Sequence, residues 1–208
     1  MKNSPPTPPD PTAVLDYWLG PEQLTAAAFE PYLERWYASS KDIDADIASR
    51  FGALLTSAER GELADWRHQR QGAIALIILL DQFSRNLYRG TPDAFRNDPA
   101  ALEIARELVA ASYYEALPPG WKLLALHPLH HAEDTVAQAQ AVQLMRSLDS
   151  DCPEDWQAMV SSSLAFFREH AEIISLFGRF PHRNRILGRH STPDELAFLE
   201  KDRRTYGQ

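Results

Sequence analysis

Apolar residues recur along this chain at the three- and four-residue spacing of amphipathic helices, and the alternating pattern of strands is nearly absent. One clear face carries Ile43, Ile47, Phe51, Leu54 and Leu55, with acidic residues opposite. The pattern therefore predicts an all-α protein.

The longest apolar run, residues 73–80, has eight residues and lies in a helix expected over residues 71–87. Its first half is apolar all round, which is typical of a helix at the centre of a bundle. A bilayer span needs roughly 20 apolar residues, so this run indicates a buried helix and no membrane partner.

Capping residues mark the ends of further helices. Thr56 with Glu59 fits a capping box, Asp98-Pro99 fits an N-cap followed by proline, and Gly178 stands where a helix C-terminus is expected. The expected segments are 43–55, 56–66, 71–87, 98–116, 128–148, 151–177 and 192–199. These indicate one domain over residues 12–200, built of eight or nine antiparallel packed helices in tetratricopeptide-like pairs, although no 34-residue period is legible.

The two ends read as tails. Five prolines stand within residues 1–11, where they favour an extended segment without the apolar core of a signal peptide, and residues 201–208 follow the last expected helix.

The composition limits the classes of partner that we expect. The 208 residues carry a formal net charge of −8, which argues against nucleic-acid binding because that function usually needs a broad basic face. A single cysteine, Cys152, excludes an internal disulfide and favours a cytoplasmic location.

Against this acidic background, residues 177–190 carry four arginines, two histidines and no acid. Gly178, Pro181 and Gly188 forbid one continuous helix, so the segment is expected to be an ordered loop. A loop so rich in bidentate donors either binds an anion or forms ion pairs that join acidic helices.

A second polar stretch, residues 81–90, follows the buried run directly. Asp81 and Arg85 stand four residues apart, and Gln82 and Asn86 repeat that spacing. Polar residues on a buried helix must be paired, so the stretch is either a local ion pair or the polar floor of a pocket.

The third stretch, residues 127–134, can place His131 and a carboxylate on one helix face. A zinc site needs at least three protein ligands in reach, so we expect no metal here and no cofactor. His170 lies on an apolar face, where a lone histidine is more often a satisfied core residue than a catalyst. Cys152 is flanked by acids, so it is a poor nucleophile.

These stretches resemble a known family. Residues 75–86 and 88–92, the segment His131-Ala132-Glu133-Asp134, and residues 177–184 with 186–189 are similar to the DUF924 family of bacterial proteins. The chain departs from the family pattern at Ser84, where proline is usual, and at Ala132, where serine is usual. The resemblance implies an all-helical, tetratricopeptide-like fold and no established biochemical activity.

So many polar residues at turns and helix ends exceed what packing alone requires. Our main hypothesis is that they form one pocket for a small anionic ligand such as a carboxylate or phosphate, and whether the protein is an enzyme stays open. The alternative is a tetratricopeptide-like scaffold for a protein partner, with the polar cluster acting as a structural ion-pair network. The candidate ligand-binding residues are Asp81, Gln82, Arg85, Asn86, Arg89, His131, Glu133, Asp134, Arg179, His182, Arg183, Asn184 and Arg189.

Overall fold

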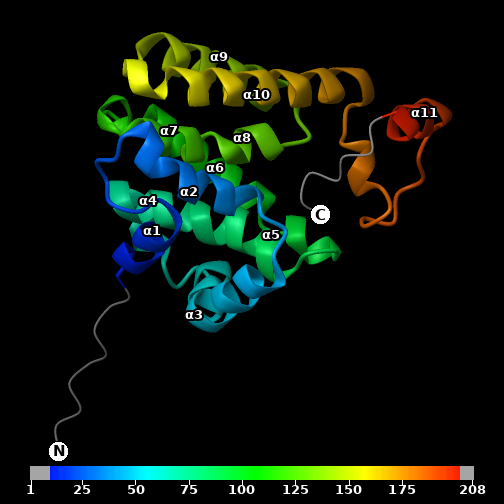
Figure 1. Ribbon diagram of the computed structural model, residues 1–208. Helices are drawn as coiled ribbons and strands as arrows, with labels where there is room; N and C mark the ends of the chain where they lie inside the picture. Colours follow the sequence, from blue (N-terminus) through cyan, green and yellow to red (C-terminus); the bar gives the residue numbers. More distant parts are fainter. Residues whose placement is uncertain (1–9, 202–208) are drawn as a thin grey trace, which may run out of the picture.

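The computed structural model describes residues 10–201, which form helices and turns and contain no strand within that range (Figure 1). The prediction of a single all-α domain is confirmed. In chain order the elements are α1 (Thr12–Trp18), α2 (Ala26–Tyr37), α3 (Lys41–Glu59), η1 (Ala64–His68), α4 (Arg70–Ile77), η2 (Ile78–Phe83), α5 (Ser84–Leu87), η3 (Pro92–Phe95), α6 (Asp98–Ala110), η4 (Tyr114–Ala116), α7 (Pro119–Ala125), α8 (His127–His131), α9 (Thr135–Asp151), η5 (Glu154–Trp156), α10 (Gln157–Phe177), η6 (Pro181–Arg183) and α11 (Pro193–Lys201).

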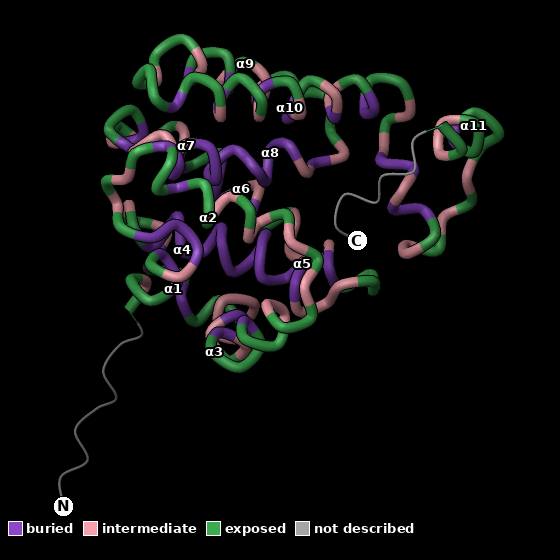
Figure 2. Tube along the Cα trace, in the orientation of Figure 1, coloured by how far each residue is buried: buried purple, intermediate pink, exposed green. Residues whose placement is uncertain are grey.

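The helix expected over residues 71–87 is the centre of the molecule. Every residue from Gly72 to Ser84 is buried, and α1, α3 and α6 pack around this helix (Figure 2). The long helices α9 and α10 lie side by side across the top of the view in Figure 1, and α8 lies beneath them. The apolar all-round pattern of residues 73–80 thus has the central place that the sequence predicted.

This central helix widens into a π-helical turn at η2 before it continues as α5. A π turn inserts an extra residue into the helical register and is frequent at functional sites. Here it spans the end of the apolar run, so the polar side chains of Asp81 and Gln82 lie within the turn and inside the core.

Two of the expected helix ends are confirmed. Gly178 ends α10 with a positive φ of 69°, and its amide donates to the carbonyl of Ile174. At the start of α11, the Glu195 amide donates to Thr192 Oγ1 at 3.2 Å and the Thr192 amide donates to Glu195 Oε2 at 2.7 Å. This reciprocal pair is the capping box that the sequence indicated.

One expected helix start is wrong, one expected helix is broken in two, and one expected cap is absent. Thr56 does not begin a helix, because it lies inside α3 and its hydroxyl donates to the Gly52 carbonyl at 3.0 Å. The helix expected over residues 128–148 is broken into α8 and α9, because Asp134 accepts from the Ala137 amide and starts a new helix. Asp98 is the first residue of α6 and caps nothing.

Residues 1–9 and 202–208, which make up most of the two predicted tails, lie outside the described residues. Within residues 10–201, no helix is both long enough and apolar enough to cross a membrane.

Glycine at position 72 is required by the close approach of η1 to the central helix. A Cβ there would lie 2.4 Å from the Trp66 carbonyl oxygen, a backbone atom that cannot move aside. We predict that Gly72→Ala lowers the free energy of unfolding by about 1–3 kcal/mol, as overpacking of a core usually does. Urea denaturation measures this loss.

The matched control is Gly52→Ala in α3, where a Cβ would meet only the end of the Leu87 side chain at 3.8 Å. Since glycine inside a helix costs about 0.5–1 kcal/mol relative to alanine, this variant should be more stable than the parent. A Gly72→Ala protein as stable as Gly52→Ala would contradict the close packing of η1 on α4.

Candidate functional site

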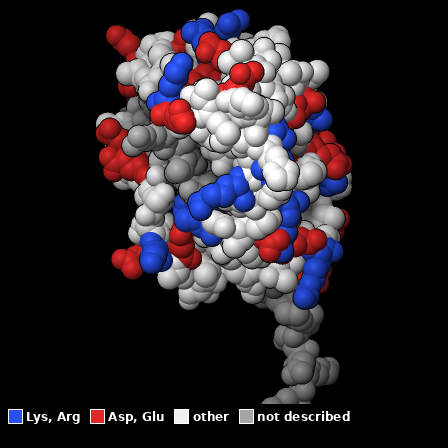
Figure 3. All heavy atoms as spheres, turned by 90° about the vertical axis from the view of Figure 1, so that its right-hand side faces the viewer, with Lys and Arg blue, Asp and Glu red and all other residues white. Residues whose placement is uncertain are grey.

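The three polar stretches meet at one end of the molecule, where η2 and α5, the end of α8 and the loop between α10 and α11 come together. Figure 3 looks onto this side and shows Lys and Arg side chains gathered near the middle of the face, with Asp and Glu side chains around them. The charges are therefore mixed, and their pairing decides what the site can bind.

Asp81 lies at the bottom of the cluster and has no solvent exposure. Its Oδ1 lies 2.8 Å from Nδ1 of His131, and the Gln82 side-chain amide donates to Oδ2 at 2.5 Å. A buried carboxylate is tolerated only when such partners replace its lost hydration. The central helix and the end of α8 are joined through this pair.

Several effects keep His131 uncharged. Burial lowers the pKa of its imidazole well below the ordinary value of 6.5, and the cations of Arg85 and Arg183 lower it further. Because a carboxylate only accepts, the neutral ring donates from Nδ1 to Asp81 and keeps Nε2 as an acceptor. The Asp81–His131 pair thus presents a proton-accepting nitrogen whose orientation is fixed.

Arg85 connects Asp81 to the start of α6. Its guanidinium donates to both carboxylate oxygens of Asp98, at 2.8 and 3.1 Å, and lies 3.5 Å from Asp81. Burial alone would lower the pKa of Arg85, but the two carboxylates outweigh it and raise the pKa above its ordinary value. Arg85 is therefore fully compensated within the protein.

Arg183 is held differently. Its side chain is 7% exposed, and its guanidinium lies over the rings of Phe180 and Phe95 at 4.4 and 4.7 Å. Its near carboxylate is Asp98, 3.5 Å away and already occupied by Arg85, and its Nε has no hydrogen-bond partner among the described residues. Burial lowers the pKa of this guanidinium to about 10, so it stays charged at neutral pH.

The outer arginines of the loop are paired. Arg189 donates to both oxygens of Glu133, at 2.6 and 2.9 Å, and Glu133 also accepts from the Phe180 amide. Arg179 makes the same two-pronged contact with Glu195, at 2.6 and 2.9 Å. Bidentate arginine–carboxylate pairs fix geometry strongly, so these two pairs fasten the loop to the end of α8 and to α11.

The remaining candidates lie in other surroundings. Asn86 and Arg89 both bind Asp44 of α3, at 2.8 and 2.9 Å, where α5 packs against α3. Asp134 is half exposed and caps α9. Asn184 donates to Glu195, and the His182 ring lies 5.4 Å from that of Phe180.

The structure thus gathers Asp81, Gln82, Arg85, His131 and Arg183 into one cluster, and the other eight candidates surround it or lie apart. Within the described part of the chain, no group of three or more His, Cys, Asp and Glu side chains is placed to hold a metal ion.

His170 meets this cluster through a stack of rings. Its imidazole lies parallel to that of His130, with centroids 4.0 Å apart, and 4.9 Å from the ring of Phe180. Burial lowers the pKa of His130 well below 6.5, which favours a neutral stacked ring. The stacked rings form the apolar side of the cluster and connect α8 to α10.

The sequence did not identify three acids as part of this network, namely Asp98, Glu195 and Asp44. Each stands in the first turn of a helix, where an acid is already explained by the helix dipole or by capping. An excess of arginine in the neighbouring motifs was the available signal, because those buried cations need carboxylate partners.

Fold and site together define an all-helical domain with a buried cluster of arginine, histidine and carboxylate side chains near one end. A family described as "Bacterial protein of unknown function (DUF924)" matches residues 14–203, so the chain belongs to the DUF924 family. This confirms the resemblance seen in the sequence motifs.

A solved structure agrees with this assignment. The protein of unknown function ATU0120 from Agrobacterium tumefaciens is 31% identical, with a TM-score of 0.76 over 92% of this chain and 97% of that one. No curated protein matches the chain.

The Arg179–Glu195 pair predicts an acid-dependent part of the stability. Its hydrogen bonds lower the pKa of Glu195 from 4.5 to about 2 in the folded protein. A lowered carboxyl pKa adds stability above the unfolded value, and that stability is lost as the pH falls through the folded value. The parent should therefore exceed Glu195→Gln in melting temperature at pH 7, with the gap closing between about pH 4.5 and 2.

Thermal melts at several pH values measure this gap. The exposed Glu172→Gln on α10 is the control and should leave the curve unchanged. A gap that stays constant down to pH 2 would exclude the ionised pair as its cause.

The Asp81–His131 pair predicts one tautomer. At pH 6 the His131 ring should be neutral with its proton on Nδ1, because burial and the nearby arginines disfavour the charged form. Nitrogen chemical shifts of the imidazole measure both properties. A doubly protonated ring at pH 6 would contradict the prediction.

Proposed function

We propose that the cluster binds a small anionic ligand, such as a carboxylate or a phosphate, at the guanidinium of Arg183. The observation that carries the proposal is the state of that side chain: buried, positively charged, held by rings and left with an Nε that has no partner among the described residues. A buried donor without a partner is destabilising, and an anion would accept a hydrogen bond from this Nε.

The neighbouring groups favour a ligand of this class. His131 offers a neutral nitrogen that can accept a proton from a ligand hydroxyl or from water. Because the surroundings are largely dehydrated, an anion there interacts more strongly with Arg183 than it would in water. The ligand must be small, since aromatic and charged side chains fill the space around the guanidinium.

A panel of inorganic phosphate, sulfate, acetate and succinate tests this proposal by thermal shift. An anion at ten times its dissociation constant adds about 1.4 kcal/mol of stability. For a chain of this size that corresponds to a rise of about 3–6 °C in melting temperature. Arg183→Met, which keeps an apolar side chain between the rings, should remove the rise while remaining folded.

Arg67→Met is the matched control, because that arginine pairs with Glu103 and Glu107 on the surface, outside the cluster. It should keep the full rise. If no anion of the panel shifts the parent, or if Arg183→Met and Arg67→Met respond alike, the ligand site is refuted and the cluster is structural.

A second readout ties the anion to the cluster. A negative charge beside His131 stabilises the protonated ring, so saturating phosphate should raise the pKa of His131 above its depressed starting value. A titration of the His131 resonance with and without phosphate measures the change. An unchanged pKa at a saturating concentration would place the anion elsewhere.

A second candidate function is a protein-interaction scaffold, in which the polar cluster only holds helices together. The paired states of Arg179 and Arg189 favour the structural part of this idea. The interaction part is favoured by an open cleft of about 700 Å³ between α2 and α10, away from the cluster.

A further inference from the structure

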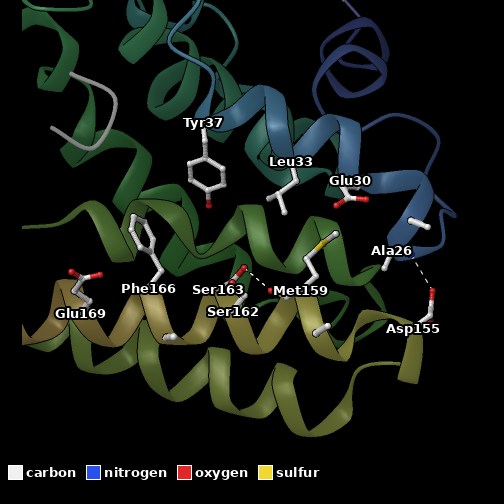
Figure 4. A pocket seen from close by; sticks show the side chains of 13 residues that line it. Ala26, Glu30, Leu33, Tyr37, Asp155, Met159, Ser162, Ser163, Phe166 and Glu169 are labelled. Atoms are coloured by element: carbon white, nitrogen blue, oxygen red, sulfur yellow. Dashed lines mark hydrogen bonds between the residues drawn. The ribbon is translucent and has the colours of Figure 1, made fainter. Parts of the chain in front are cut away.

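The cleft between α2 and α10 is an unfilled gap between two helix faces (Figure 4). One face of α2 lines it with residues spaced three or four apart, from Ala26 to Tyr37. The facing side of α10 contributes small side chains, among them Ala158, Ser162 and Ala165. Small residues on facing helices normally allow close packing, yet here the helices stay apart.

Contacts bridge the gap at each end. At one end the Ala26 amide of α2 donates to the carboxylate of Asp155 at 3.0 Å. At the other end the ring of Tyr37 meets that of Phe166 edge to face, with centroids 6.3 Å apart. Between these two supports, Leu33 and Met159 point into the gap from opposite sides (Figure 4).

The lining combines apolar surface with negative charge. Leu33, Met159 and Phe166 offer the apolar part, and Tyr37 is 53% exposed, a large fraction for an aromatic side chain. The carboxylates of Glu30, Asp155 and Glu169 also line the cleft, and no Lys or Arg among residues 10–201 does. This favours an occupant with apolar groups and positive charges.

The dimensions select the shape of that occupant. From Asp155 to Glu169 the cleft runs about 21 Å at 1.5 Å per helical residue. A helix about 10 Å wide would meet the Ala26–Asp155 and Tyr37–Phe166 contacts that bridge the two ends of the cleft. An extended chain fits, and at about 3.3 Å per residue some six residues fill the length.

We propose that this cleft binds an extended, cationic and partly apolar peptide segment of a partner protein. The proposal rests on the second candidate function and gives that function a place on the molecule and a class of partner. Leu33, Met159 and Phe166 would bury apolar side chains of the segment, while Glu30 and Asp155 at the rim would attract its Lys or Arg side chains. The hydroxyls of Ser162 and Tyr37 line the cleft where they can meet the peptide backbone.

Fluorescence anisotropy with a positional-scanning library of labelled hexapeptides tests the proposal on the full chain. Each position carries Lys, Leu, Asp or Ser in turn. We expect Lys and Leu to strengthen binding and Asp to weaken it. Raising the salt concentration should weaken binding of the best Lys/Leu peptide, since exposed charges are screened within about 8 Å at 0.15 M.

Two pairs of variants locate the peptide. Ser162→Trp fills the cleft and should weaken binding of the best peptide by at least about tenfold. Its control, Ser161→Trp, lies on the adjacent exposed position outside the cleft and should bind normally. Glu30→Gln should weaken binding several-fold, whereas Glu34→Gln, with the same charge change on the same helix, should not.

The outcomes that contradict the proposal distinguish between the cationic partner and the interaction function on which it rests. If Asp-containing peptides bind best and Ser162→Trp abolishes their binding, the cationic partner is refuted and the interaction function stands. If no hexapeptide binds, both are refuted. Binding that survives Ser162→Trp, or that Glu34→Gln weakens as much as Glu30→Gln, is attraction to an acidic surface and refutes the cleft as the site.

Discussion

A fully buried carboxylate is the constraint on which the polar end of this molecule depends. Asp81 follows the apolar run into the core, where an uncompensated charge would cost several kcal/mol. Compensation comes from His131 at the end of α8 and from Arg85 one turn further along. Since Arg85 in turn binds Asp98, three parts of the chain far apart in sequence are fixed around one side chain.

The basic loop is attached to this centre in two ways. Arg189 and Arg179 fasten it through bidentate pairs with Glu133 and Glu195, which is a sufficient structural reason for two of its four arginines. Arg183 reaches the same Asp98 as Arg85 but only at 3.5 Å, so one carboxylate serves two buried cations. Because it shares its carboxylate, Arg183 differs from Arg179 and Arg189, which each have a carboxylate of their own. A substitution of Arg183 therefore distinguishes a ligand site from a purely structural network.

The two proposed sites share no residue and differ in chemistry, and Phe166 at one end of the cleft contacts the His130–His170 stack. The cluster around Arg183 is buried and balances two arginines against the carboxylates of Asp81 and Asp98, and a small anion would bind at the Nε of Arg183. The cleft between α2 and α10 is open, apolar and lined with carboxylates, so it suits a positively charged chain. Helix α10 takes part in both regions, because His170 stacks on His130 next to the cluster while Ser162 and Met159 face the cleft.

The helical class, the central helix with its buried polar end, the glycine end of α10 and the capping box of α11 could all be predicted from the sequence. Each of these follows from side chains within a few residues of one another, through periodicity or local hydrogen bonds. Only the folded structure shows that Asp44, Asp98 and Glu195 receive the arginines and that α2 and α10 stand apart. These features depend on contacts between residues far apart in sequence, which periodicity and capping rules do not encode.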